Sequence, residues 1–511
     1  MMNKEIASDT KTVSSTATNK GLHIEEALIF ERGSTDRSGV DLPEISGRSH
    51  RLGKLRRLDR IGLPGLSEPE IVRHYTRLSR NNYAIDIGLY PLGSCTMKHN
   101  PRLNELVARL PGFSDIHPLQ PPSTVQGAMA LIKELEEWLT ALTGFPNIAL
   151  SPAAGAQGEL CGLMVIRSYL EKQGDPRETV LVADSAHGTN PATATMCGYR
   201  TKSIPSNDSG TLDLQALENM LDNKVAAVML TNPNTCGLFE GQILEISDAV
   251  HKSGALLYCD GANFNAIVGK VKPADLGIDI MHLNLHKTFS TPHGGGGPGS
   301  GPVAMTSVLA PYAPLPWVEE SASGFTITEH LGDHSQQSFG RMRAWHGQMG
   351  MFVRALSYLI SHGGDGLRQV AEDAVLNANY IRQGLHKHYS MPYPGTCMHE
   401  VLCDDQSLKP AGLKTLDVAK ALIDQGFHPM TIYFPLIVNG AMLIEPTETE
   451  TKEILDQFID AMITIANHST SENIAALQNA PVHTPRRRLD ETKAARNPIL
   501  RWLQDTGPSA T

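Results

Sequence analysis

The residues with the clearest chemical potential lie around Lys287. This lysine follows the apolar stretch 280–285 and precedes a run of four glycines, Gly294–Gly297. An amine that forms a Schiff base must reach an aldehyde and be partly desolvated, so that it can lose a proton near neutral pH. Glycines let the backbone approach a bulky ligand because they carry no Cβ atom. The alternative is a surface lysine before a flexible loop, which for an isolated lysine is the commoner case.

Two further residues follow apolar stretches upstream of the lysine. Asp260 lies 27 residues before Lys287, and His187 follows the stretch 179–183. A buried carboxylate keeps the pyridine nitrogen of an electron-sink cofactor protonated, and an imidazole ring can stack on the pyridine face. Taken alone, such an aspartate is more often a turn residue or helix N-cap, and such a histidine is as often an ordinary loop residue. The ordered set favours the catalytic interpretation.

The turn Gly155–Gln157 opens a predicted helix over 157–171. Successive N–H groups at a helix N-terminus bind a phosphate dianion, although short glycine turns often only cap helices. Zinc is a weaker interpretation, because His282, His286 and His293 have no further ligand at metal spacing. A nucleotide P-loop is a weaker interpretation still, since the glycines follow the lysine instead of preceding it and the P-loop motif does not appear. We therefore expect a phosphate-bearing organic cofactor and no metal.

The elements that must position these residues alternate between strands and helices from about 150 to 310. Apolar strands separated by helices predict βαβ units and a mostly parallel sheet, with ligands at the carboxyl ends of its strands. The predicted strands are 179–183, 226–231, 255–259, 280–285 and 302–305. The predicted helices of this region are 157–171, 212–222 and 244–253, and another helix is predicted at 124–143.

The remainder of the chain predicts a smaller α/β domain between terminal segments. Its predicted helices are 349–361, 366–386 and 450–467, and its strands are 398–403 and 431–438. The expected organisation is an extended arm over 1–65, a large α/β domain over 66–345, a small domain over 346–484 and a charged tail over 485–511.

The composition argues against some classes of binding partner and indicates a cellular compartment. The net charge of −10 argues against nucleic acid as the main partner, since phosphate contacts need a concentrated basic surface. Apolar runs are only strand-sized, so no membrane span is expected. The polar first twenty residues resemble neither a secretory signal nor a transit peptide. Seven scattered cysteines without a CxxC pair indicate a reducing compartment, and we expect the cytoplasm.

Beyond single residues, a series of longer motifs resembles the glycine decarboxylase (P-protein) family of the glycine cleavage system, specifically subunit 2 of its two-chain form. The resemblance covers about residues 25 to 503. Its motifs are Tyr90-Pro-Leu-Gly-Ser-Cys-Thr-Met-Lys98, Ser185-Ala-His-Gly-Thr-Asn-Pro191, Asp260-Gly-Ala-Asn263, His282-Leu-Asn-Leu-His-Lys287, the glycine loop, Thr431-Ile-Tyr-Phe-Pro-Leu436 and Glu445-Pro-Thr-Glu-Thr-Glu450.

This resemblance implies the aspartate-aminotransferase-like (type I) fold and pyridoxal 5′-phosphate as cofactor. It makes Lys287 the Schiff-base lysine, Asp260 the partner of the pyridine nitrogen and His187 the stacking ring. It also places further cofactor-binding residues at Gly155, Ala156, Gln157, Asn263, His286 and Thr96, with Ser94 near the cofactor.

The family's reaction is an oxidoreductase step of glycine catabolism that decarboxylates glycine and transfers the aminomethyl group to the lipoyl group of the H-protein. The resemblance implies a hetero-oligomer with a separate subunit 1. An arginine should bind the substrate carboxylate, and Arg341 and Arg343 are candidates. The alternatives are another type I enzyme acting on a small amino acid, such as a hydroxymethyltransferase or aminotransferase, or a non-catalytic scaffold subunit.

Overall fold

The chain divides into two compact units, which are described separately here. One unit comprises Met1–Ala84 with Asn479–Thr511, and the other comprises Ile85–Gln478. The computed structural model describes residues 25–34, 37–40, 43, 52–59, 61–292, 299–329, 337–469 and 473–502. The predicted glycine loop and His293 lie outside these residues.

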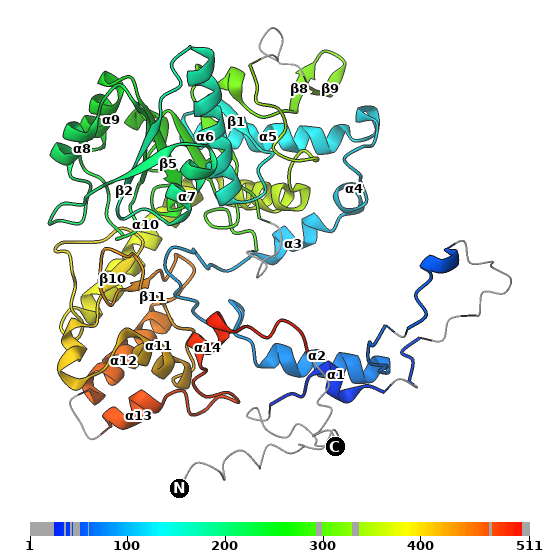
Figure 1. The fold of residues 1–511 in the computed structure, drawn as a ribbon, viewed down its shortest axis with the longest axis vertical. Helices are drawn as coiled ribbons and strands as arrows, with labels where there is room; N and C mark the ends of the chain where they lie inside the picture. The colour runs from blue at the N-terminus through cyan, green and yellow to red at the C-terminus, as the bar shows by residue number, and fades with distance from the viewer. Residues whose placement is uncertain are drawn as a thin grey trace. The chain divides into compact units, whose positions relative to one another are not determined.

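A seven-stranded sheet forms the core of the larger unit, in the order β1-β7-β6-β5-β4-β2-β3 (Figure 1). Strands β2 to β6 are parallel to one another, and β7 runs antiparallel to both β6 and β1. The predicted mostly parallel sheet is therefore confirmed. The strands are β1 (Asn147–Ala149), β2 (Thr179–Ala183), β3 (Arg200–Ile204), β4 (Val225–Thr231), β5 (Leu256–Gly261), β6 (Ile280–Leu283) and β7 (Val303–Met305).

Both faces of this sheet are buried, which explains why its central strands are continuous apolar runs rather than alternating ones. In β4, Val228 and Leu230 point to one hydrophobic cluster and Ala227 and Met229 to another, as the two-residue period of a strand requires. Helices α5 (Gln126–Thr143), α9 (Ile243–Lys252) and α10 (Met349–Leu385) contribute to the first cluster, and α6 (Gly155–Lys172) contributes to the second. In Figure 1, α6 and α7 (Thr189–Met196) lie beside strands β2 and β5.

The remaining elements of the larger unit border this layered core. Helix α8 (Leu214–Met220) lies between β3 and β4 in the chain, and strands β8 (Trp317–Ser321) and β9 (Gly324–Thr328) form an antiparallel hairpin. Two short helices, α3 (Arg102–Ala108) and α4 (Pro111–Ser114), precede α5.

Helix α10 contains a break at Gly363. The backbone there has φ 62° and ψ −177°, a region that is essentially restricted to glycine. The two helices predicted over 349–361 and 366–386 are therefore confirmed as two helical segments joined at this glycine.

A second, antiparallel sheet has the order β10-β12-β11. Its strands are β10 (Val401–Cys403), β11 (Thr431–Ile432) and β12 (Met442–Ile444), and it lies with helices α11 (Thr415–Asp424), α12 (Lys452–His468) and α13 (Ile474–Asn479). The predicted strand over 431–438 was wrong beyond its first two residues. Tyr433 has φ 58°, and Pro435 has no N–H to donate to a neighbouring strand, so pairing stops after Ile432.

The loop over residues 90–98 lies along strand β12. Leu92 forms a bridge with Ile444, and the Gly93 N–H donates to the carbonyl of Leu443. A Cβ atom on Gly93 would lie 2.4 Å from Leu443, so this close approach requires glycine. The loop is thereby fixed to the smaller sheet.

The unit formed by the two ends of the chain contains helices α1 (Ile29–Arg32), α2 (Glu68–Arg80) and α14 (Glu491–Arg496). Helix α2 begins after Ser67, whose N–H donates to Glu70 in a capping box. The Glu26 carboxylate pairs with Arg32 and Arg77. Among all described helices, none combines the length and apolar character that a bilayer span requires.

We expect Leu257→Ala to destabilise the larger unit strongly. Leu257 on β5 is fully buried in the first cluster, and its truncation leaves a cavity in a close-packed core, at a cost of about 2–5 kcal/mol. The matched control is Leu376→Ala, because Leu376 is 64% exposed, and a change of under about 0.5 kcal/mol is expected there. Chemical unfolding of both variants measures the difference, and equal losses would contradict this account of the core.

Candidate active site

A cavity of about 270 Å³ lies where the parallel strands of the larger sheet end. Strand β4 contributes Thr231, β5 contributes Asp260, and β6 is followed by Lys287. The full lining is Ser94, Ala154, Gly155, Ala156, Glu159, His187, Thr189, Thr231, Thr235, Asp260, Ala262, Asn263, His282, Asn284, His286 and Lys287. Most of the predicted site residues therefore meet in one cavity, although Gln157 and Thr96 do not line it.

The Lys287 side chain is almost completely buried, at 9% exposure. Its residue lies in a short turn after β6, in which the Lys287 N–H donates to the carbonyl of Asn284. The Nζ atom donates to the backbone carbonyl of Ser94 at 2.7 Å. A desolvated amine is thus held against the loop that lies along β12.

Asp260 is a buried carboxylate surrounded by donors. Burial alone would raise its pKa, but His282, the Ala262 N–H, Asn190 and the Lys287 ammonium together hold the pKa of this carboxyl below its ordinary value. The Ala262 N–H and the Asn190 amide donate at 2.9 Å and 3.1 Å. Asp260 therefore remains ionised inside the protein.

A short chain of side chains continues behind Asp260. The Tyr258 hydroxyl lies 2.6 Å from His282 Nδ1, and His282 Nε2 lies 3.3 Å from Asp260 Oδ1. Burial lowers the pKa of His282, and it raises that of Tyr258 well above its ordinary value. A neutral tyrosine can then donate to Nδ1, which leaves the Nε2 proton directed at the carboxylate. Both ring nitrogens of His282 are thus engaged within the protein.

His187 also lines the cavity, as a neutral ring. Burial lowers its pKa below the ordinary value, and its Nδ1 lies 2.8 Å from the Thr189 hydroxyl. That hydroxyl donates onward to Glu159 Oε1 at 2.8 Å. Burial, together with the charge of Asp260, raises the pKa of Glu159 to about 8. An uncharged imidazole held by one edge presents its face for stacking.

The N-terminus of α6 forms another wall of the cavity. The first N–H groups of an α-helix have no intrahelical acceptor, and Gly155 and Ala156 provide two of them. A Cβ atom on Gly155 would lie 2.7 Å from Asn284 Oδ1, so the helix can come this close only at a glycine. Gln157 instead stabilises the preceding turn, because its Oε1 accepts from the Ala153 N–H at 2.6 Å.

These residues fit a cofactor that carries an aldehyde, a pyridine ring and a phosphate. The amine, the ionised acid, the neutral ring and the helix N-terminus surround one cavity. Two lining atoms, Thr231 Oγ1 and Asn284 Oδ1, are buried without a hydrogen-bond partner in the described protein. Buried polar groups in folded proteins are normally paired, so these two atoms mark positions where a ligand can supply the partner.

Three of the predicted residues have other surroundings. Thr96 donates its N–H to Glu445 and lies behind the cavity rather than on its wall. Arg341 pairs with Glu329, and neither Arg341 nor Arg343 is among the residues that line this cavity. Within the described part of the chain, the cavity wall contains no arginine, so the group that binds a substrate carboxylate stays unassigned.

The sequence reasoning missed Glu159, Asn190 and the role of His282. Glu159 lies one helical turn after Gly155, and that spacing was the available indication that it faces the same cavity. Asn190 follows His187 in one motif, so it could have been included with it. The pairing of His282 with Tyr258 depends on the register of β5 and β6, which the sequence does not state.

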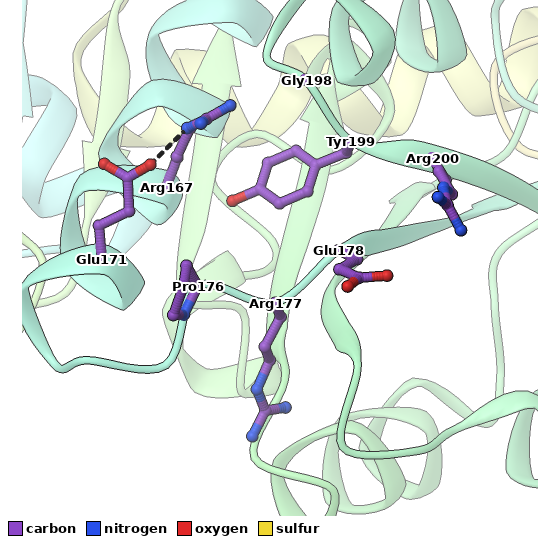
Figure 2. Close-up of a pocket in the computed structure, with 8 residues that line it drawn as sticks. All are labelled: Arg167, Glu171, Pro176, Arg177, Glu178, Gly198, Tyr199 and Arg200. Atoms are coloured by element: carbon purple, nitrogen blue, oxygen red, sulfur yellow. Dashed lines mark hydrogen bonds and ion pairs between the residues drawn. The ribbon is translucent and has the colours of Figure 1, made fainter.

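Another cavity, also of about 270 Å³, lies at the opposite edge of the sheet (Figure 2). Its Glu178 directly precedes β2 and its Arg200 begins β3. Figure 2 shows Arg167 directed at Glu171, and Arg177 donates to the carbonyls of Val225 and Ser253. These two arginines are engaged within the protein, and the amino ends of parallel strands are not where ligands of such sheets gather.

Comparison with known proteins agrees with this geometry. Residues 160–296 match the family model "Aminotransferase class-V", and residues 370–486 match "Glycine dehydrogenase, C-terminal domain". The chain is 60% identical to the protein named "Probable glycine dehydrogenase (decarboxylating) subunit 2" of Caulobacter vibrioides, over 98% of this chain and 96% of that protein. It is 50% identical to the corresponding subunit of Caldanaerobacter subterraneus, over 94% and 99%.

Solved structures share the fold at low sequence identity. A glycine decarboxylase (P-protein) of the glycine cleavage system, in inhibitor-bound form, superposes with a TM-score of 0.69 at 21% identity, over 80% of this chain and 92% of that chain. A cysteine desulfurase from Thermococcus onnurineus superposes with a TM-score of 0.58 at 15% identity, over 75% and 95%. The predicted aspartate-aminotransferase-like fold is confirmed.

The raised pKa of Glu159 predicts a pH-dependent stability. Because its folded-state pKa of about 8 lies above the ordinary value of 4.5, the folded protein binds this proton more tightly than the unfolded chain does. The proton on Glu159 therefore stabilises the folded protein fully below about pH 4.5, and this stabilisation is lost as the pH rises through about 8. We expect the melting temperature of the cofactor-free protein to fall less steeply between about pH 6 and 8.5 in Glu159→Gln than in the parent protein.

The matched control for this comparison is Glu137→Gln, at an exposed position in the middle of α5. It should reproduce the pH slope of the parent protein. Identical slopes for all three proteins in scanning calorimetry would show that Glu159 does not hold a proton at neutral pH.

Proposed function

Because this chain belongs to the glycine dehydrogenase (decarboxylating) subunit 2 family, we propose that it catalyses the pyridoxal phosphate-dependent decarboxylation of glycine in the glycine cleavage system. The observation that carries this proposal is the convergence of Lys287, Asp260 and His187 on one cavity at the strand ends. A scaffold subunit without catalytic function would have no need to keep a buried amine and a buried carboxylate in the same cavity.

Each residue has a defined task in this proposal. Lys287 Nζ would bond the cofactor aldehyde, and Asp260, held within a shell of donors, would keep the pyridine nitrogen protonated. His187 would stack on the ring, and the first turn of α6 at Gly155 and Ala156 would bind the phosphate. When bound, the cofactor would supply an acceptor for the electrons of the breaking bond between the glycine α-carbon and its carboxylate.

The protein environment controls the charge around this reaction. The Tyr258–His282 pair directs an N–H at Asp260, so the carboxylate is stabilised without a second full charge beside it. Glu159 holds a proton at neutral pH, which keeps Asp260 the only ionised carboxyl of this pair. The arrangement favours one protonation state of the cofactor ring.

The remaining assignments concern partners and compartment. The relatives are named as subunit 2, and we infer a hetero-oligomer with subunit 1. The lipoyl group of the H-protein is the proposed acceptor of the aminomethyl group. None of the seven cysteines forms a disulfide, which supports the proposal that the protein functions in the reducing cytoplasm.

The activity is tested by exchange of labelled bicarbonate into the carboxyl group of glycine. We expect exchange that requires pyridoxal phosphate, lipoylated H-protein and subunit 1, because decarboxylation is then reversible on the carrier. An aminotransferase or hydroxymethyltransferase cannot incorporate the label. Label-free glycine from the fully reconstituted system would contradict the proposed reaction and favour one of those activities or a scaffold role.

The role of Lys287 is tested by Lys287→Ala. We expect the visible absorbance of the bound cofactor to disappear and exchange to fall to background, because the only covalent anchor is removed. Lys270→Ala is the matched control, since Lys270 lies on the surface and pairs with Glu372. If the Lys287→Ala protein kept the visible absorbance band after dialysis, Lys287 would not be the covalent anchor of the cofactor.

A further inference from the structure

Two glutamates, Glu400 and Glu445, lie behind the cavity wall and are completely buried. Glu400 directly precedes β10 and Glu445 directly follows β12. The antiparallel register pairs Val401 with Ile444, so the same register sets Glu400 opposite Glu445. Residues opposite each other in such a ladder have neighbouring side chains, and two like charges there are destabilising.

The loop over residues 90–98 connects these carboxyls to the catalytic lysine. The Ser94 N–H donates to Glu400 Oε1, and the Thr96 N–H donates to Glu445 Oε2 at 2.9 Å. The carbonyl of the same Ser94 accepts from Lys287 Nζ at 2.7 Å. A single residue thus separates the lysine nitrogen from the Glu400 carboxyl.

The conformation of this loop depends on those bonds. Ser94 has φ 63° and Thr96 has φ 31°, in the left-handed region that residues with a Cβ atom rarely occupy. Such conformations persist where the surroundings fix them. The two carboxyls each fix one of the two strained residues, and so they shape the surface that receives Lys287.

The two carboxyl oxygens of Glu400 and Glu445 that accept no hydrogen bond from the loop lie near a third buried side chain, His399. Glu400 Oε2, Glu445 Oε1 and both ring nitrogens of His399 have no hydrogen-bond partner among the described residues. His399 Nε2 lies 3.9 Å from Glu400 Oε2 and 4.0 Å from Glu445 Oε1, too far for a direct hydrogen bond. Burial lowers the pKa of His399 to about 3, so this ring is neutral and adds no positive charge.

The surroundings of the Glu400 and Glu445 carboxyls favour a state in which the two together carry one negative charge at most. Burial, with the other carboxyl beside it, raises the pKa of Glu400 well above its ordinary value, and burial raises that of Glu445 to about 7. The Lys287 ammonium opposes both shifts. The other groups that face the pair are the charge-paired Glu448 and neutral thiols, Cys95, Cys236 and Cys397, whose pKa values burial raises.

We propose that Glu400 and Glu445 share one proton and act together as a single negative counter-charge that positions Lys287 through the Ser94 peptide. The two glutamates are positioning residues, since neither lines the cavity. The inference rests on the proposed role of Lys287. In this proposal the site has two anionic groups. The glutamate pair compensates the charge of the lysine nitrogen, whereas Asp260 is the partner of the pyridine nitrogen of the cofactor.

The test uses Glu400→Gln, Glu445→Gln and the double variant. A glutamine oxygen can still accept from the Ser94 or Thr96 N–H, so the loop keeps its bonds while the charge changes. In either single variant the remaining glutamate can ionise, and the net charge of the pair stays at one. Only the double variant removes it. Glu450→Gln is the control, because Glu450 has a pKa raised to about 7 by burial alone, without a contribution from Lys287.

The readout is the pH midpoint at which the visible absorbance of the bound cofactor changes. We expect both single variants and the control to stay within about 0.3 unit of the parent protein. The double variant should fall by about 1 unit or more, since an opposite charge within a few ångströms shifts such equilibria by about 1–3 units. An unshifted double variant overturns the proposal, and so does a single variant that shifts as far as the double.

An infrared measurement keeps the proposal testable if the double variant does not fold. A protonated carboxyl group gives a C=O stretching band, and Glu159 contributes such a band to every variant. We therefore expect the difference spectrum between the parent protein and each single variant at neutral pH to show the loss of one carboxyl band. Difference spectra without this loss in both single variants overturn the shared proton. The two proposals fail differently: a parent protein without a cofactor band rejects the role of Lys287, whereas a normal band that ignores the glutamate changes rejects only the counter-charge.

Discussion

The structure of the site depends on keeping a small number of charges ionised away from water. An isolated ion inside a protein is strongly unfavourable, so each must be matched by donors or by an opposite charge. Asp260 is matched by N–H groups and by the buried amine of Lys287. The lysine in turn is held by a backbone carbonyl and lies close enough to two further carboxyls to oppose the rise that burial causes in their pKa values. The strand ends and loops place a donor or an opposite charge beside each of these buried ions.

Much of the large sheet follows from local sequence alone. Continuous apolar runs such as Val225–Leu230 can only be buried on both faces, and the helices between them force parallel connections. Lys287 and Asp260 were found because each comes at the end of such a run. The fold and the central pair of residues were therefore predictable, and the first turn of α6 was too.

The rest of the site depends on contacts between segments that are far apart in the sequence. Glu400 and Glu445 become neighbours only through the register of two short strands, and they reach the site only through a loop at residues 90–98. The same limit explains the error after Ile432. A β-branched, aromatic stretch predicts a strand, but the left-handed Tyr433 and the proline that follows end it.

The loop at residues 90–98 contacts both the smaller sheet and the cavity at the strand ends of the larger one. Gly93 is fixed to β12 of the smaller sheet, and the next residue holds the nitrogen of Lys287. Two adjacent residues of this loop therefore contact both the smaller sheet and the lysine. The placement of the amine thus depends on the smaller sheet as well as on the larger one, although none of the residues that line the cavity belongs to a strand of the smaller sheet.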